Sequence, residues 1–195
     1  MEDIFALAQQ NQQCAREVLQ STQIMELWQS IGAQVNLIGS LKMGLLMKHL
    51  DIDMHLYTPA VNIEDDFRVM SRLACTPNLQ SIMYRNLLDT EEACLEWHAH
   101  YKDNDNRIWQ LDMIHIVKNS KYDGYFEQVA NRIMSVITSE QKKTILRLKY
   151  DTPNTESIRG IEYYKAVIES GIDNYPDFHQ WRKEQAAEAI IEWMP

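Results

Sequence analysis

The first part of the chain changes from a helical to a strand-like pattern of hydrophobic positions. Apolar side chains recur at helical spacing over residues 2–20 and again over residues 24–31. A short apolar run at 35–38 predicts a strand, and the alternation of apolar with polar residues over 51–57 predicts a second, half-buried strand. The intervening residues 41–50 are expected to form a short helix. This order indicates a region in which helices and strands are mixed.

A strong turn signal in the middle of the chain separates two predicted strands. The helix predicted over residues 62–75 is followed by strands over 80–87, 93–101 and 107–117. The last two flank the sequence Asp103-Asn104-Asp105-Asn106, and short polar residues of this kind favour tight turns. We therefore expect these two strands to form an antiparallel hairpin.

From Asn119 onward the pattern is helical. Ser139, and Asp173 or Asn174, are the expected amino-terminal caps of two of the helices. We predict an α+β fold, with a mixed sheet and its flanking helices over residues 1–119 and a C-terminal helical bundle over residues 120–195. The helices predicted in the second part are 122–137, 139–149, 157–170 and 175–194.

Composition and charge exclude several classes of protein. The 195 residues are 45% hydrophobic, which is enough for one good core. The apolar runs are short and broken by charged residues, and the start of the chain lacks the features of a signal peptide, so we expect a cytoplasmic protein without a membrane partner. Three scattered cysteines, Cys14, Cys75 and Cys94, indicate neither a disulfide framework nor a zinc pair. A net charge of −9 makes nucleic acid an unlikely partner.

One group of residues carries a recognisable chemistry. A predicted strand ends at Gly39-Ser40 and a predicted helix begins there, so free backbone N–H groups can receive a phosphate. Lys42 on that helix can add a positive charge. On the next strand Asp51 and Asp53 are two residues apart, so their carboxylates point to the same face. Carboxylates in this arrangement repel each other unless a cation lies between them, and Mg²⁺ bound by carboxylates and substrate phosphates meets that need.

This stretch resembles the signature of the nucleotidyltransferase superfamily, which includes DNA polymerase beta and the aminoglycoside and lincosamide nucleotidyltransferases. The signature is a hydrophobic residue, Gly, Gly or Ser, a helix, and then Asp-hydrophobic-Asp or Glu-hydrophobic. Ile38-Gly39-Ser40 and Asp51-Ile52-Asp53-Met54 match it. Leu111-Asp112-Met113-Ile114 supplies the third acid that the family carries on a later strand. The resemblance covers about residues 31–117, and the helical part resembles the family only loosely.

The resemblance implies an enzyme that moves a nucleoside monophosphate from a nucleoside triphosphate, such as ATP, to a hydroxyl of an unidentified small-molecule or protein acceptor. It implies that Asp51 and Asp53 bridge two Mg²⁺ ions, for which Mn²⁺ is an alternative. Asp112 would ligate the catalytic metal and orient or deprotonate the acceptor. The triphosphate would be held by Gly39, Ser40 and Lys42.

Several neighbouring residues leave alternatives open. Glu96, on the strand beside Asp112, could serve as the third acid instead. His55 shares the face of the aspartates, where a buried, hydrogen-bonded histidine is the commoner role. Tyr163 or Lys165 could touch the nucleotide, although packing between the two halves is the simpler expectation. A zinc site is a weaker possibility for three histidines of the predicted hairpin, namely His98, His100 and His115.

Two other classes of function compete with an active transferase. The first is an inactive member of the same fold that works through protein contact, as the antitoxin partners of helical toxins do. An intact set of three acids argues against this alternative. The second is a metal-dependent phosphohydrolase, which would need more His and Asp ligands than the sequence assembles. A homodimer is possible through the apolar amino-terminal helices that carry Trp28.

Overall fold

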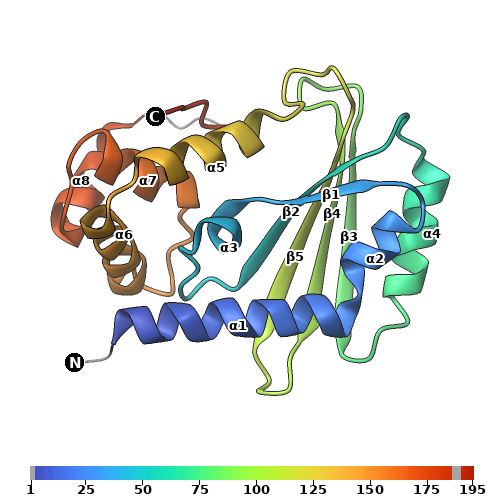
Figure 1. The fold of residues 1–195 in the computed structure, drawn as a ribbon, viewed down its shortest axis with the longest axis horizontal. Coiled ribbons are helices and arrows are strands. Elements are labelled where there is room, and N and C mark those ends of the chain that lie inside the picture. Colours follow the sequence, from blue (N-terminus) through green and yellow to red (C-terminus); the bar gives the residue numbers. More distant parts are fainter. Residues whose placement is uncertain (1–2, 186–189) are drawn as a thin grey trace.

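The computed structural model describes residues 3–185 and 190–195, which form one mixed sheet with helices on both sides (Figure 1). None of the helices in these residues has the length and apolar character that crossing a lipid bilayer demands. In chain order the elements are α1 (Ile4–Thr22), α2 (Ile24–Gln29), β1 (Gln34–Leu37), α3 (Gly39–Met43), β2 (Asp51–Tyr57), α4 (Ile63–Leu73), β3 (Leu79–Leu87), β4 (Cys94–Lys102), β5 (Ile108–Ile116), α5 (Tyr125–Val136), α6 (Ser139–Asp151), α7 (Gly160–Ile168) and α8 (Tyr175–Glu184).

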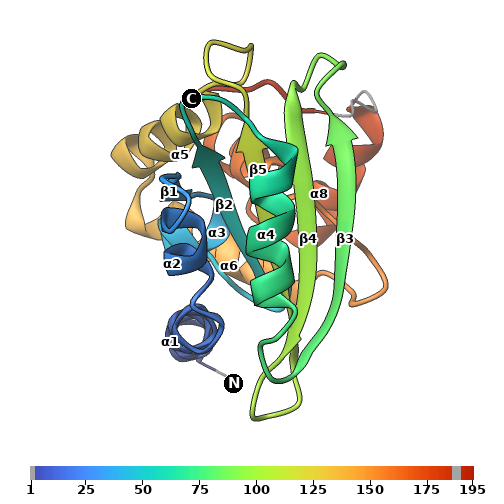
Figure 2. The ribbon, with the colours of Figure 1, turned by 90° about the vertical axis from the view of Figure 1, so that its right-hand side faces the viewer.

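The sheet has five strands in the order β1-β2-β5-β4-β3. β2 and β5 run parallel, and the other neighbouring pairs are antiparallel. β4 and β5 form the hairpin that the sequence predicts, and the carboxylate of Asp103 closes its turn by accepting hydrogen bonds from the backbone N–H groups of Asp105 and Arg107. α2 and α4 cover one face of the sheet, whereas α5 to α8 gather on the other side (Figures 1 and 2).

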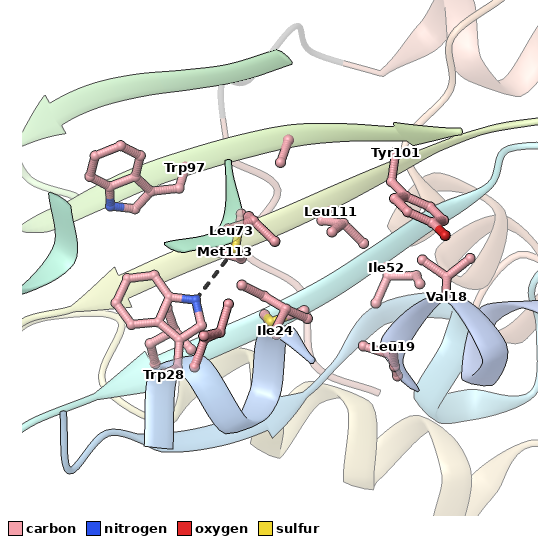
Figure 3. Packing of buried hydrophobic residues seen from close by; sticks show 14 of the residues in the cluster. Val18, Leu19, Ile24, Trp28, Ile52, Leu73, Trp97, Tyr101, Leu111 and Met113 are labelled. Atoms are coloured by element: carbon pink, nitrogen blue, oxygen red, sulfur yellow. Dashed lines mark hydrogen bonds between the residues drawn. The ribbon is translucent and has the colours of Figure 1, made fainter. Parts of the chain in front are cut away.

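The face of the sheet under α2 and α4 holds the first hydrophobic core (Figure 3). Ile52 of β2 and Leu111 of β5 are fully buried there, between α1, α2 and α4. Trp28 of α2 donates its indole N–H to the sulfur of Met113 over 3.4 Å. Because alternate residues of a strand point to opposite faces, burial of these side chains directs their sequence neighbours to the other face.

A second core joins the C-terminal helices to parts of the amino-terminal half. Ile145 of α6 and Phe178 of α8 are fully buried in it. Ala8 of α1 and the loop residues Leu45 and Met47, which follow α3, belong to the same cluster. α1 therefore packs in the second core with its first turns and in the first core with its last turns.

Two helix boundaries near the middle of the chain differ from the predictions. The helix predicted over 41–50 is only the short α3, because Gly44 adopts a left-handed conformation (φ 72°) that ends it after Met43. α6 is capped by Thr138 rather than by Ser139, since the Thr138 side chain accepts the hydrogen bond of a reciprocal capping box.

The last predicted helix, 175–194, is shorter in the structure. Asn174 caps it as expected, by accepting a hydrogen bond from the backbone N–H of Asp177. α8 ends at Glu184, where Gln185 adopts an extended conformation. The predicted residues 186–189 lie outside the described part of the chain, and residues 190–195 are not helical.

Candidate active site

The three aspartates predicted from the sequence lie close together on two adjacent parallel strands. Asp51 and Asp53 are on β2, and Asp53 is directly opposite Asp112 of β5. Their neighbours Ile52, Leu111 and Met113 point into the first core. Because side chains alternate along a strand, the three carboxylates lie on the opposite face of the sheet. All three line one cavity of about 360 Å³. The structure thus brings together residues that are about sixty positions apart in the sequence.

Gly39 allows the turn between β1 and α3 to pass against the Asp53 carboxylate. Its backbone has a φ of 63°, a conformation that glycine adopts without strain. A Cβ atom at this position would lie 2.0 Å from Oδ2 of Asp53. Glycine is therefore needed here for two reasons, the backbone conformation and the space that Asp53 occupies.

Burial and mutual repulsion favour the protonated forms of the Asp51 and Asp53 carboxyl groups. Burial, together with the charges of Asp112 and Asp51, raises the pKa of Asp53 from 3.8 to about 7. Burial and then the charge of Asp112 also raise the pKa of Asp51. A bound cation would relieve this repulsion, because it would supply the positive charge that a proton otherwise provides.

A lysine from the C-terminal half completes the cavity. Lys149 of α6 is only 8% exposed, and its ammonium group donates to the hydroxyl of Ser40 at 2.8 Å and to the carbonyl of Leu45 at 3.0 Å. It also donates to the hydroxyl of Tyr164 on α7 at 3.0 Å, and the Ser40 and Tyr164 hydroxyls are 2.8 Å apart. Ser40 thus bonds to α6 through Lys149 and to α7 through Tyr164.

The other residues considered for the nucleotide differ in their relation to the cavity. Lys42 is on α3 but does not line the cavity. Tyr163 lines it, but the ring is buried and stacks on Phe178 at a centroid distance of 4.6 Å. The neighbouring Tyr164 reaches Ser40 instead, and Lys165 is not part of the lining. Successive residues of a helix point about 100° apart, so Tyr163 and Tyr164 both line the cavity but make different contacts.

Asp112 has hydrogen-bond partners of its own on the open face of the sheet. Nδ1 of His98 on β4 lies 2.5 Å from Oδ1 of Asp112, and the side chain of Gln110 donates to both oxygens at 2.9 and 3.0 Å. The hydrogen bond to Asp112 raises the pKa of His98. Glu96, the alternative third acid, lies farther along β4 opposite Ile114. Asp112 is therefore the acid that stands beside Asp53.

The histidines of the hairpin do not form a common site. His98 faces Asp112, and His100 bonds to the hydroxyl of Ser81 at 2.9 Å. His115 is on the covered face, where its Nδ1 lies 2.8 Å from the buried carboxylate of Asp66. Alternation along β5 separates His115 from the other two, and the zinc hypothesis finds no support.

The donor chemistry of the aspartate site nevertheless fits a hard divalent cation. Within residues 3–185 and 190–195 no three His, Cys, Asp or Glu side chains already converge closely enough to hold a metal ion. Asp51, Asp53 and Asp112 do offer carboxylate oxygens on one cavity wall, and the raised pKa of Asp53 reflects their crowding. Oxygen ligands with excess negative charge are what Mg²⁺ prefers.

Three residues of the site were not anticipated from the sequence, namely Lys149, Tyr164 and His98. For Lys149 a signal existed, because it lies one helical turn after Ile145 on the apolar face of α6. A lysine on such a face needs polar partners. For Tyr164 the sequence indicated the correct helix, but the residue it singled out was the adjacent Tyr163. No sequence signal distinguishes His98 from His100, since both point to the same face of β4.

Comparison with known proteins identifies the fold. No protein-family model matches the chain, and no curated protein matches its sequence. Among solved structures, a cytoplasmic RNA terminal U-transferase has 14% identity and a TM-score of 0.54, over 80% of this chain and 44% of that chain. Cid1, described by its RNA terminal uridylyl transferase activity, has 14% identity and a TM-score of 0.56, over 81% of this chain and 46% of that chain.

The polymerase core of TRAMP, an RNA surveillance complex, has 13% identity and a TM-score of 0.53, over 78% of this chain and 48% of that chain. The present chain spans less than half the length of each of these three proteins. The mixed sheet, its flanking helices and the place of the aspartates on β2 and β5 agree with the resemblance that the sequence motif carries. The chain therefore has the fold of the nucleotidyltransferase superfamily.

Proposed function

We propose that this protein is a metal-dependent nucleotidyltransferase that moves a nucleoside monophosphate from a nucleoside triphosphate to an acceptor hydroxyl. The observation that carries the proposal is the juxtaposition of Asp53 with Asp112 on parallel strands, in the same cavity as the Gly39-Ser40 turn and Lys149. That cavity combines crowded carboxylates with a buried positive charge and the hydroxyls of Ser40 and Tyr164. A magnesium–triphosphate complex has the complementary chemistry.

Asp51, Asp53 and Asp112 would hold Mg²⁺ or Mn²⁺, and the bound metal would supply Lewis-acid stabilisation of the phosphate oxygens. The hydroxyl of Ser40 and the ammonium group of Lys149 would hold the triphosphate, because they present donors and positive charge at the cavity wall. Glycine at position 39 would let the phosphates approach the backbone.

The transfer forms one phosphorus–oxygen bond and breaks another. The acceptor oxygen attacks the α-phosphorus, the bond from that phosphorus to the bridging oxygen breaks, and pyrophosphate leaves with the electron pair. The hydroxyl proton would pass to the carboxylate of Asp112 and from there to solvent, since 18% of the Asp112 side-chain surface is exposed. His98 and Gln110 would fix the orientation of that carboxylate.

Two of the proteins compared above are described as RNA terminal uridylyl transferases. The expectation that nucleic acid is not a partner therefore gains no support from them. RNA with a free 3′ hydroxyl therefore belongs in the acceptor screen beside small molecules and proteins. The identity of the fold supports nucleotidyl transfer as the reaction class and leaves the acceptor open.

Calorimetric titration with ATP, GTP, CTP and UTP in the presence of Mg²⁺ tests the proposal. We expect at least one triphosphate to bind the wild type. This binding should require Mg²⁺ and should be lost in the Asp51→Asn, Asp53→Asn double variant. Asp89→Asn is the control, because Asp89 is an exposed carboxylate outside the site. If no triphosphate bound the wild type, the transferase proposal would fail, and an inactive protein-contact role would take its place.

A further inference from the structure

β3 lies at one edge of the sheet, and its outer side is open. The strand order places β4 on one side of β3, and no strand of the described residues pairs with the other side (Figure 2). β3 has nine residues, whereas β1, at the opposite edge, has four. An edge strand presents a row of unpaired backbone N–H and C=O groups. β3 is therefore long enough to pair with a further strand.

The sequence of β3 lacks the features that usually prevent such pairing. Natural edge strands are commonly protected by proline, by lysine or other charged side chains, or by bulges. β3 contains neither proline nor lysine, and Arg85 is its one charged residue. The Arg85 guanidinium already pairs with Glu96 of β4 at 3.3 Å. The ladder with β4 is irregular only at its start, between Leu79 and Ser81. Residues 81–87 therefore form a regular edge that carries little charge.

Apolar side chains are exposed on both faces of the sheet at this edge. On the open face, Met83 is 54% exposed, the largest fraction among the large apolar side chains of the described residues. On the covered face, Phe67 of α4 is 47% exposed, although its ring lies 5.0 Å from that of Tyr84 and 4.8 Å from that of Trp97. Ile82 and Tyr84 of β3 are only partly buried in the first core. The first core is thus incompletely covered at β3.

We propose that β3 pairs antiparallel with β3 of a second copy of this chain, which joins two five-stranded sheets into one of ten strands. In the register that we infer, Met83 lies directly opposite Met83 of the second copy. On the covered face, Ile82 then lies opposite Tyr84 of the second copy, an aromatic and β-branched pair of the kind that stabilises sheets. On the open face, Arg85 lies opposite Ser81. The inference does not depend on the proposed function.

The side chains of β3 are complementary to themselves, which is what an interface with two-fold symmetry requires. The chosen register keeps the two Arg85 side chains four residues apart along the strands, about 14 Å, so like charges do not meet. A shift of the axis by one residue in either direction places Met83 opposite a polar residue, Arg85 or Ser81. The amino-terminal helices are a poorer surface for a dimer, because Trp28 is fully buried within one chain.

Sedimentation velocity of the full chain tests the association. We expect a reversible change from the mass of one chain to the mass of two as the concentration rises from roughly 1 to 100 μM. Met83→Lys should raise the dissociation constant roughly 100-fold, because two ammonium groups would then face each other across the axis. Met134→Lys is the matched control, since it makes the same change at a side chain of α5 that is 39% exposed and lies away from β3 (Figure 1). Thermal unfolding of both variants at low concentration checks that the single chain still folds.

Disulfide cross-linking tests the register. Directly opposite residues of antiparallel strands have Cα atoms about 4.5–5.5 Å apart, a separation that a disulfide spans. In a Cys75→Ser background, which removes an exposed thiol, Met83→Cys should give a covalent dimer under mild oxidation. Arg85→Cys should not, because the two substituted positions are about 14 Å apart in this register.

Each contrary outcome overturns the inference. If the protein keeps the mass of one chain at every concentration, β3 does not pair with a second copy, and a strand from a different protein becomes the occupant to seek. A dimer that withstands Met83→Lys would place the interface on another surface. Cross-linking through Arg85→Cys instead of Met83→Cys would show a different register.

Discussion

At the scale of single residues, the site depends on an atom that Gly39 lacks. A Cβ there would meet Oδ2 of Asp53 at 2.0 Å, so Gly39→Ala must displace that carboxylate. We expect nucleotidyl transfer to fall at least 100-fold, and stability to fall by about 1–2 kcal/mol from the left-handed backbone. Gly171→Ala is the control, because Gly171 has a φ of 67° and nothing within 4 Å of its added Cβ. Equal loss of activity in both variants would contradict the role assigned to the contact.

A second residue-scale prediction concerns the cost of an ionised Asp53. Its pKa is raised from 3.8 to about 7, so the folded protein loses stability as pH rises through that window. Asp53→Asn removes the charge. The metal-free variant should therefore match the wild type below about pH 4 and exceed its unfolding free energy by a few kcal/mol at pH 8.

Chemical denaturation across this pH range, without Mg²⁺, measures the difference between Asp53→Asn and the wild type. Adding Mg²⁺ should stabilise the wild type more than the variant and narrow the difference in unfolding free energy, because the proposed metal site needs the Asp53 carboxylate. Asp89→Asn, an exposed change of the same kind, should show no such pH dependence. A variant that is less stable than the wild type at pH 8 would refute the argument.

The sequence predicted the aspartates but not their partners, for a physical reason. Asp51 and Asp53 belong to one strand, so their common face follows from alternation alone. Asp112 follows only from the resemblance, which implies a third acid on a later strand. Lys149 and Ser40 are 109 positions apart, and their contact depends on how α6 packs against the loop after α3. No local pattern encodes that packing.

At the scale of elements, a single cap distinguishes the observed start of α6 from the predicted one. Thr138 forms the reciprocal capping box, while Ser139 is the first residue of the helix. Thr138→Ala should lower the free energy of unfolding by about 1 kcal/mol, because a backbone N–H loses its partner. Ser139→Ala should change the free energy of unfolding by a few tenths of a kcal/mol at most. Thermal unfolding of the two variants decides which residue is the cap.

Strands were predicted more reliably than helix ends. The β4–β5 hairpin follows from the polar turn at Asp103, whose side chain does bond to the turn backbone. α3 was overestimated because residues 45–47 are apolar in a helical pattern, yet they form a loop in which Leu45 and Met47 are buried in the second core and Leu46 in the first. Gly44 was the available signal, since a left-handed glycine commonly ends a helix.

At the scale of the whole molecule, the two cores share parts of the same chain segments. The predicted boundary at residues 119 and 120 separates the sheet from the C-terminal helices in sequence. The second core nevertheless takes Ala8 and Leu45 from the first part of the chain. Lys149 of α6 also joins the two parts through hydrogen bonds, because it donates to the Ser40 hydroxyl and to the Leu45 carbonyl. These contacts predict that the two parts unfold together.

Leu45→Ala tests that expectation in the intact protein. Leu45 is fully buried, so the substitution should cost about 2–5 kcal/mol. If unfolding is cooperative, amide hydrogen exchange should lose equal protection in β5 and in α6, although the mutated residue contacts the helical core. In the monomer, Met83→Ala, at a side chain that is 54% exposed, should change neither the free energy of unfolding nor the exchange protection of β5 and α6. Loss of protection in α5 to α8 alone, with β5 unchanged, would mean that residues 120–195 open as a separate domain.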